Sequence, residues 1–91
     1  MIVGSAVPRF APGVRLQESR ARDGWVLLAP ERLLMLDEHA CAVLQLLDGV
    51  RCVAAIVDDL ALRYGASRAV VAADVTELLQ ALLGMNVIRL G

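Results

Sequence analysis

The stretch GWVLLAPERLLMLD, from Gly24 to Asp37, decides the fold of this chain. Trp25–Leu28 is a short apolar run of β-prone residues, and Pro30 ends it because proline has no N–H to donate to a sheet. The apolar run Arg32–Leu36 follows this Pro-containing turn, so we predict a further strand at the edge of a sheet. Asp37 then has the side chain of a helix N-cap.

A preceding strand completes the predicted sheet. Val14, Leu16 and Glu18 alternate with polar residues, which is the period-two pattern of a half-buried strand. The turn signal Asp23-Gly24 joins this strand to the next as a hairpin. Residues 1–13 contain prolines and glycines and show no period, so we expect an irregular N-terminal arm.

Three helices are predicted after the strands. The first begins at Asp37 and is stopped by Asp48-Gly49. The second spans about 53–64, where apolar residues recur at helical spacing before a glycine. The third extends from a Ser67 cap to about residue 83, Gly84 ends it, and its apolar stripe is Val71, Val75, Leu78 and Leu82. Residues 87–90 form a last short strand or a packed tail. The order of elements indicates an α+β domain with helices on one side of a small antiparallel sheet.

Size and charge exclude several classes of protein. A chain of 91 residues forms one domain, here residues 1–91, with one modest core. A net charge of −1 argues against a dedicated nucleic-acid binder, which normally has a basic face. No apolar run is long enough to span a bilayer, and the N-terminus lacks a secretory pattern. We therefore expect a cytoplasmic protein that does not interact with membranes.

Residue types that carry chemistry are few and scattered. His39 is the one histidine, and Cys41, two positions away on a helix, points to the opposite side. Cys41 and Cys52 lack the spacing of a metal site, and the adjacent pair Asp58-Asp59 diverges on a helix. We therefore predict a binding protein, not an enzyme, with no cofactor and no metal.

Two features indicate a binding site. The strand Arg32–Leu36 has an open edge to which a partner strand can add. The third helix has more apolar residues than one stripe needs, and Asp74 lies among them, where it must face water, a partner or an internal donor. The predicted peptide-binding residues are Arg32, Leu33, Leu34, Met35, Leu36, Val71, Asp74, Val75 and Leu78.

The order and spacing of these motifs resemble the family of pyrroloquinoline quinone biosynthesis protein D (PqqD), a precursor-peptide recognition domain. The likeness covers about residues 8–90 and rests on Arg22, Trp25–Leu28, Pro30-Glu31, Ala40, Val43-Leu44, Leu47, Asp48-Gly49, Val53, Ile56-Val57, Leu60, Asp74-Val75, Leu78 and Leu82. Two positions depart from the family pattern. Ala29 replaces an aromatic residue that is common before Pro-Glu, and Cys52 replaces a Thr or Ser before the second helix.

The resemblance implies a winged-helix-like fold, with a three-stranded antiparallel sheet followed by three helices. It implies a chaperone that binds the ribosomally made precursor peptide of pyrroloquinoline quinone (PqqA-like). It also implies presentation of that peptide to a radical S-adenosylmethionine enzyme (PqqE-like), with the peptide beside the third strand and against the third helix. The alternatives are a winged-helix DNA-binding domain and a plain dimerisation module. The apolar edge and the N-terminal arm also make a homodimer formed by strand exchange a prediction.

Overall fold

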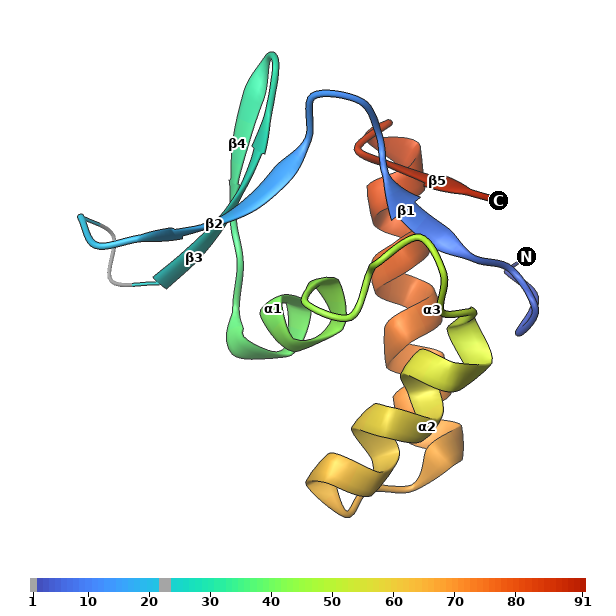
Figure 1. Cartoon of the computed structure of the whole chain (residues 1–91). Coiled ribbons are helices and arrows are strands. Elements are labelled where there is room, and N and C mark those ends of the chain that lie inside the picture. Colours follow the sequence, from blue (N-terminus) through green and yellow to red (C-terminus); the bar gives the residue numbers. More distant parts are fainter. Residues whose placement is uncertain (1, 22–23) are drawn as a thin grey trace.

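The computed structural model describes residues 2–21 and 24–91 (Figure 1). Its elements are β1 (Pro8–Phe10), β2 (Arg15–Ser19), β3 (Gly24–Ala29), β4 (Arg32–Met35), α1 (Glu38–Leu44), α2 (Val53–Tyr64), α3 (Arg68–Gly84) and β5 (Ile88–Leu90). This order confirms the predicted α+β fold with a three-stranded antiparallel sheet followed by three helices. Arg22 of the family signature and Asp23 of the predicted turn lie outside the described residues. No described helix is long and apolar enough to cross a membrane.

The three-stranded sheet has the order β2-β3-β4, which confirms β4 as an edge strand. Ala29 pairs with Arg32 around a two-residue turn at Pro30-Glu31, and the register continues to Val26 opposite Met35. The central strand β3 contributes fully buried Leu27 to the core that the helices share. Figure 1 shows the hairpin of β3 and β4 projecting away from α2 and α3, with α1 directly after β4.

The prediction of an irregular N-terminal arm is wrong for Pro8–Phe10. These residues form β1, which pairs antiparallel with β5 in a second sheet. Main-chain bonds extend the pairing, because Val7 and Gly91 exchange two hydrogen bonds and Ala11 donates to Val87. The partner strand lies at the far end of the chain, and three residues are too few to show a period, so the local pattern did not reveal the pairing.

The arm also caps the second helix. Cys52 is the N-cap residue of α2 but makes no side-chain capping bond. The N–H of Val53 donates instead to the carbonyl of Ala6 at 2.8 Å, and the N–H of Ala54 donates to the carbonyl of Gly4 at 2.9 Å. Two of the four N–H groups that a helix start leaves unbonded are therefore satisfied by the main chain of the arm.

The first helix begins where predicted and ends earlier. The N–H of Ala40 donates to Oδ1 of Asp37 at 2.7 Å, which confirms the predicted cap. The helix ends at Leu44, four residues before the predicted stop at Asp48-Gly49, because the chain changes there from α-helical to 3₁₀ hydrogen bonding. The N–H groups of Leu46 and Leu47 bond the third residue before them, as in a 3₁₀ turn.

Asp48 and Gly49 organise the connection to α2 rather than the end of α1. The Asp48 carboxylate accepts the N–H groups of Val50 and Arg51 at 2.9 and 2.8 Å. These bonds to the Arg51 and Val50 main chain are the largest causes that hold the pKa of Asp48 below its usual value. Gly49 has a φ of 76°, a left-handed conformation that favours glycine.

The third helix differs from its prediction in its core face and in the residue that takes the left-handed position after its end. Val75, Leu79 and Leu82 are its buried residues, whereas Val71 and Leu78 are half-buried. Gly84 is the last residue of α3, and the left-handed residue is Asn86, with a φ of 61°. Asn86 and Val87 bond the Leu83 and Leu82 carbonyls in a Schellman pattern. The helix thus ends at Gly84, as predicted, but the left-handed position of its cap falls on Asn86, since asparagine also tolerates this conformation.

Candidate functional site

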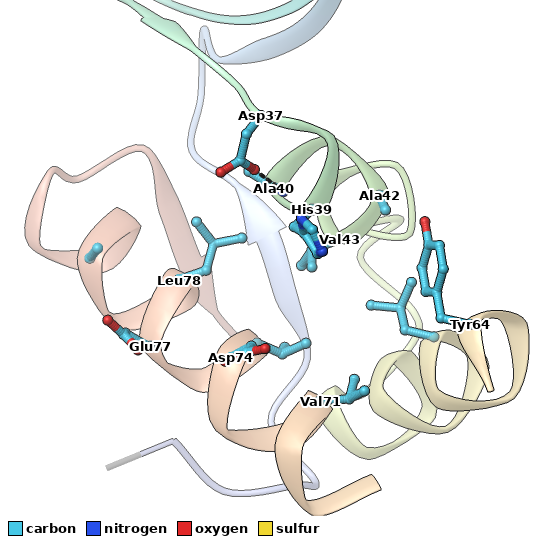
Figure 2. Close-up of a pocket in the computed structure, with 13 residues that line it drawn as sticks. Asp37, His39, Ala40, Ala42, Val43, Tyr64, Val71, Asp74, Glu77 and Leu78 are labelled. Carbon is cyan, nitrogen blue, oxygen red and sulfur yellow. Dashed lines mark hydrogen bonds between the residues drawn. The ribbon is translucent and has the colours of Figure 1, made fainter. Parts of the chain in front are cut away.

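A cavity of about 380 Å³ lies where the three helices meet. This volume is within the range of small-ligand pockets. Figure 2 shows His39 and Val43 on the α1 side, Val71 and Leu78 on α3, and Tyr64 at the end of α2. The lining residues are Asp37, His39, Ala40, Ala42, Val43, Leu60, Tyr64, Val71, Asp74, Val75, Glu77, Leu78 and Ala81.

The α3 side of the cavity is the face predicted from sequence. Val71, Asp74, Val75 and Leu78 are separated by three or four residues, which places them on one side of a helix. All four line the cavity. The half-buried state of Val71 and Leu78 follows from this position, because one side of each packs on the core and the other faces the hollow.

The predicted strand residues lie elsewhere. None of Arg32–Leu36 lines the cavity, but the next residue, Asp37, does. The N–H of Leu36 donates to the carbonyl of Trp25 on β3, at 3.2 Å. Hydrogen-bonding direction alternates along an antiparallel strand, so the N–H groups of Leu33 and Met35 point to the open edge. The predicted site is thus two adjoining parts, an open strand edge and a cavity at its carboxyl end.

The side chains along this edge differ between its two faces. Leu33 and Met35 are 40% and 60% exposed, whereas Leu34 and Leu36 pack against the core. The positions whose main-chain groups are open to a partner strand therefore also have exposed apolar side chains. A strand that added here would cover both the polar main chain and these apolar side chains.

Acidic groups stand around an otherwise largely apolar cavity. Asp37, Asp74 and Glu77 line it and are exposed. The ion pairs among the described residues lie elsewhere and join Asp48 to Arg51, Asp59 to Arg63 and Asp58 to Arg68. Asp74 therefore has no ion pair with an arginine of the described hairpin, which leaves it free to face water or a partner.

The groups with nucleophilic or metal-binding potential do not converge. Cys41 is buried, and its desolvation, followed by the nearby charge of Glu18, raises the pKa of its thiol. A raised pKa leaves the thiol protonated and weakly nucleophilic. Within residues 2–21 and 24–91, no three His, Cys, Asp or Glu side chains are grouped so that they could hold a metal ion.

The profile of the family Coenzyme PQQ synthesis protein D (PqqD) matches residues 24–88. The chain belongs to the PqqD family. A Xanthomonas axonopodis pv. citri relative named PqqA binding protein is 48% identical over 83 residues, 91% of this chain and 90% of the relative. One from Rhodopseudomonas palustris (strain HaA2), with the same name, is 54% identical over 74 residues, 81% of this chain and 70% of the relative.

Two solved PqqD structures resemble this PqqD-family chain. The PqqD part of Methylobacterium extorquens PqqCD, described as a functional, stand-alone recognition element for ribosomally made, modified peptides, is 42% identical with a TM-score of 0.85. The match covers 98% of this chain and 95% of that one. The crystal structure of PqqD from Xanthomonas campestris is also 42% identical, with a TM-score of 0.62 and coverage of 98% and 99%. These matches support the α+β fold and the assignment to the family.

The α1 and α2 sides of the cavity were missed from sequence. Tyr64, the last residue of α2, is 60% exposed and lines the cavity with Leu60. Glu77 of α3, which was not among the predicted site residues, lies at the cavity as well. The position of α1 relative to α3 depends on tertiary packing, so no local signal in either segment identifies the cavity that both line.

Proposed function

We propose that this protein binds PqqA, the ribosomally made precursor peptide of pyrroloquinoline quinone, and presents it to a radical S-adenosylmethionine enzyme. The observation that carries this proposal is the open edge of β4 leading into a largely apolar cavity against α3. The names of the Xanthomonas and Rhodopseudomonas relatives and the role of the Methylobacterium structure support it. A ribosomally made peptide also favours action in the cytoplasm, as predicted.

In the proposed complex, the peptide adds as a strand along Arg32–Leu36. Its main chain bonds the outward N–H and C=O groups of Leu33 and Met35, and its side chains rest on Val71, Asp74, Val75 and Leu78. Four such bonds at roughly 0.5–1.5 kcal/mol each supply about 2–6 kcal/mol. A micromolar complex needs about 8 kcal/mol, so apolar contact with α3 and the cavity has to supply the remainder.

The charges of the helices disfavour the DNA-binding alternative. Asp58 and Asp59 lie on α2, and Asp74 and Glu77 lie on α3, the two helices that could enter a groove. Such carboxylates repel phosphates. Dimerisation through the β4 edge would occupy the peptide site, so the two uses of this edge compete and a peptide titration separates them.

A binding titration with a matched control tests the proposal. We expect fluorescently labelled PqqA to bind the protein, and Leu78→Asn to weaken binding at least tenfold because it replaces apolar surface of the cavity with a polar amide. Leu62→Asn is the control, since Leu62 is 86% exposed on α2 and does not line the cavity. Its affinity should stay within about twofold of the unmodified protein.

Presentation to the enzyme requires a second measurement. Size-exclusion chromatography of the protein, PqqA and the purified radical S-adenosylmethionine enzyme should give one complex that contains all three. Failure of PqqA to bind, or submicromolar binding to duplex DNA that weakens steeply with salt, would overturn the proposed function.

A further inference from the structure

The cavity combines an apolar floor with carboxylates at its mouth. Ala42, Val43 and Val75 are buried at its base, whereas Asp37, Asp74 and Glu77 are exposed around it. The acidic groups come from both walls, because Asp37 precedes α1 and the other two lie on α3. A guest side chain that entered between α1 and α3 would therefore pass carboxylates on both sides.

This arrangement discriminates between types of side chain. An acidic side chain would be repelled, and a large apolar one would cover carboxylates without offering them a donor. Lysine and arginine combine an apolar stem with a charged head, so the stem can lie on the apolar floor while the head stays at the wet mouth. His39 is the only basic side chain among the described lining residues.

The place of the cavity in the fold specifies which part of the peptide reaches it. The last residue of β4 is Met35, and Asp37, two positions later, already lines the cavity. A peptide strand paired with β4 therefore reaches the cavity with a residue just beyond the one opposite Met35. On the basis of the proposed function, we propose that this residue of PqqA is a lysine or arginine whose side chain the cavity binds.

Variants that remove charge without removing shape test this assignment. Asp37→Asn keeps the helix cap, because asparagine caps as well as aspartate. Asp74→Asn and Glu77→Gln are isosteric changes at exposed positions. Each should weaken PqqA binding about two- to fivefold, the range for one partly exposed charge pair, and the triple variant about tenfold or more. Glu38→Gln is the control, since Glu38 is exposed in the first turn of α1 but does not line the cavity.

The matching change in the peptide identifies the guest. In synthetic PqqA, each lysine and arginine is replaced in turn by norleucine, which keeps an apolar stem and lacks the charge. One replacement should weaken binding to the unmodified protein about tenfold and have little further effect on the triple variant, because both changes remove the same interaction. The loss should shrink as salt is raised, since salt screens exposed charges.

The outcomes separate this inference from the proposed function. If PqqA binds and every norleucine peptide binds equally well, the cation assignment is wrong while peptide binding stands. If removing the charge from the peptide and removing the charges from the cavity have additive effects on the binding free energy, the basic residue binds elsewhere and the assignment is also wrong. If unmodified PqqA does not bind at all, both proposals are overturned.

Discussion

Leu78→Ala and Leu79→Ala remove the same atoms from neighbouring positions of α3, and we expect them to have opposite effects. Leu79 is fully buried in the shared core, whereas half-buried Leu78 lines the cavity. Truncating a fully buried leucine costs the lost transfer energy plus a cavity, roughly 3–5 kcal/mol. Leu78 already borders open space, so its truncation should cost less than about 1.5 kcal/mol.

The size of the chain makes this difference easy to measure. A domain of 91 residues has a free energy of unfolding of roughly 5–14 kcal/mol. Leu79→Ala should remove a large fraction of it and lower the Tm by about 12 °C or more, since each kcal/mol is worth about 4–8 °C in a domain of this size. Urea titration, monitored by Trp25 fluorescence and by circular dichroism, gives the free energy of unfolding of each variant. Agreement between the two signals tests two-state behaviour.

Binding should show the reverse order. Leu78→Ala should weaken PqqA binding several-fold, whereas Leu79→Ala, measured below its melting temperature, should leave the affinity nearly unchanged. Equal losses of stability in the two variants would refute the division of α3 into a core face and a cavity face. Unchanged PqqA affinity in Leu78→Ala would refute the assignment of the cavity to the peptide.

Three further predictions concern the arm and the cysteines. Deleting residues 1–7 removes the four main-chain bonds of Gly4, Ala6 and Val7 to α2 and Gly91, so the free energy of unfolding in urea should fall by about 2–6 kcal/mol. Cys52→Ser should raise the free energy of unfolding by only about 0.5 kcal/mol in the full chain, because the arm already accepts two N–H groups of α2. The gain should be larger in the chain that lacks residues 1–7, and urea titrations of the two pairs of proteins measure both gains. Burial, followed by the charge of Glu18, raises the pKa of the Cys41 thiol above its ordinary value, so the neutral thiol favours the folded state below the ordinary thiol pKa, and this contribution is lost as the pH rises through the raised pKa. Melts between about pH 8 and 11 should therefore show an alkaline loss in the unmodified protein that Cys41→Ala lacks.

Elements with local signals could be predicted from the sequence. The predicted bounds of α2 agree with the structure, since an apolar period of 3.6 is followed by Gly65, which has a left-handed φ of 60°. The Asp37 cap and the edge position of β4 also depend on neighbouring residues and are confirmed. The α3 half of the candidate site follows from the same helical spacing, and its four residues do line one cavity.

Features that depend on distant partners could not be predicted. The pairing of β1 with β5 joins residues at opposite ends of the chain. The core row of α3 includes Leu79 rather than Leu78, because the positions of α1 and α2 decide which side of a mostly apolar helix is covered. The contribution of α1 to the cavity could not be predicted for the same reason, because it depends on how the helices pack together. Periodicity shows that a helix has apolar faces, but it does not show which of them stays open.

Amide hydrogen exchange along β4 tests the central claim most directly. The N–H groups of Arg32, Leu34 and Leu36 point to β3, whereas those of Leu33 and Met35 point to the open edge. With the ¹⁵N-labelled protein saturated by PqqA, exchange at Leu33 and Met35 should slow at least tenfold, with little change at the three residues between and beside them. Unchanged exchange at Leu33 and Met35, with protection centred instead on α2 or on the N-terminal arm, would contradict the account.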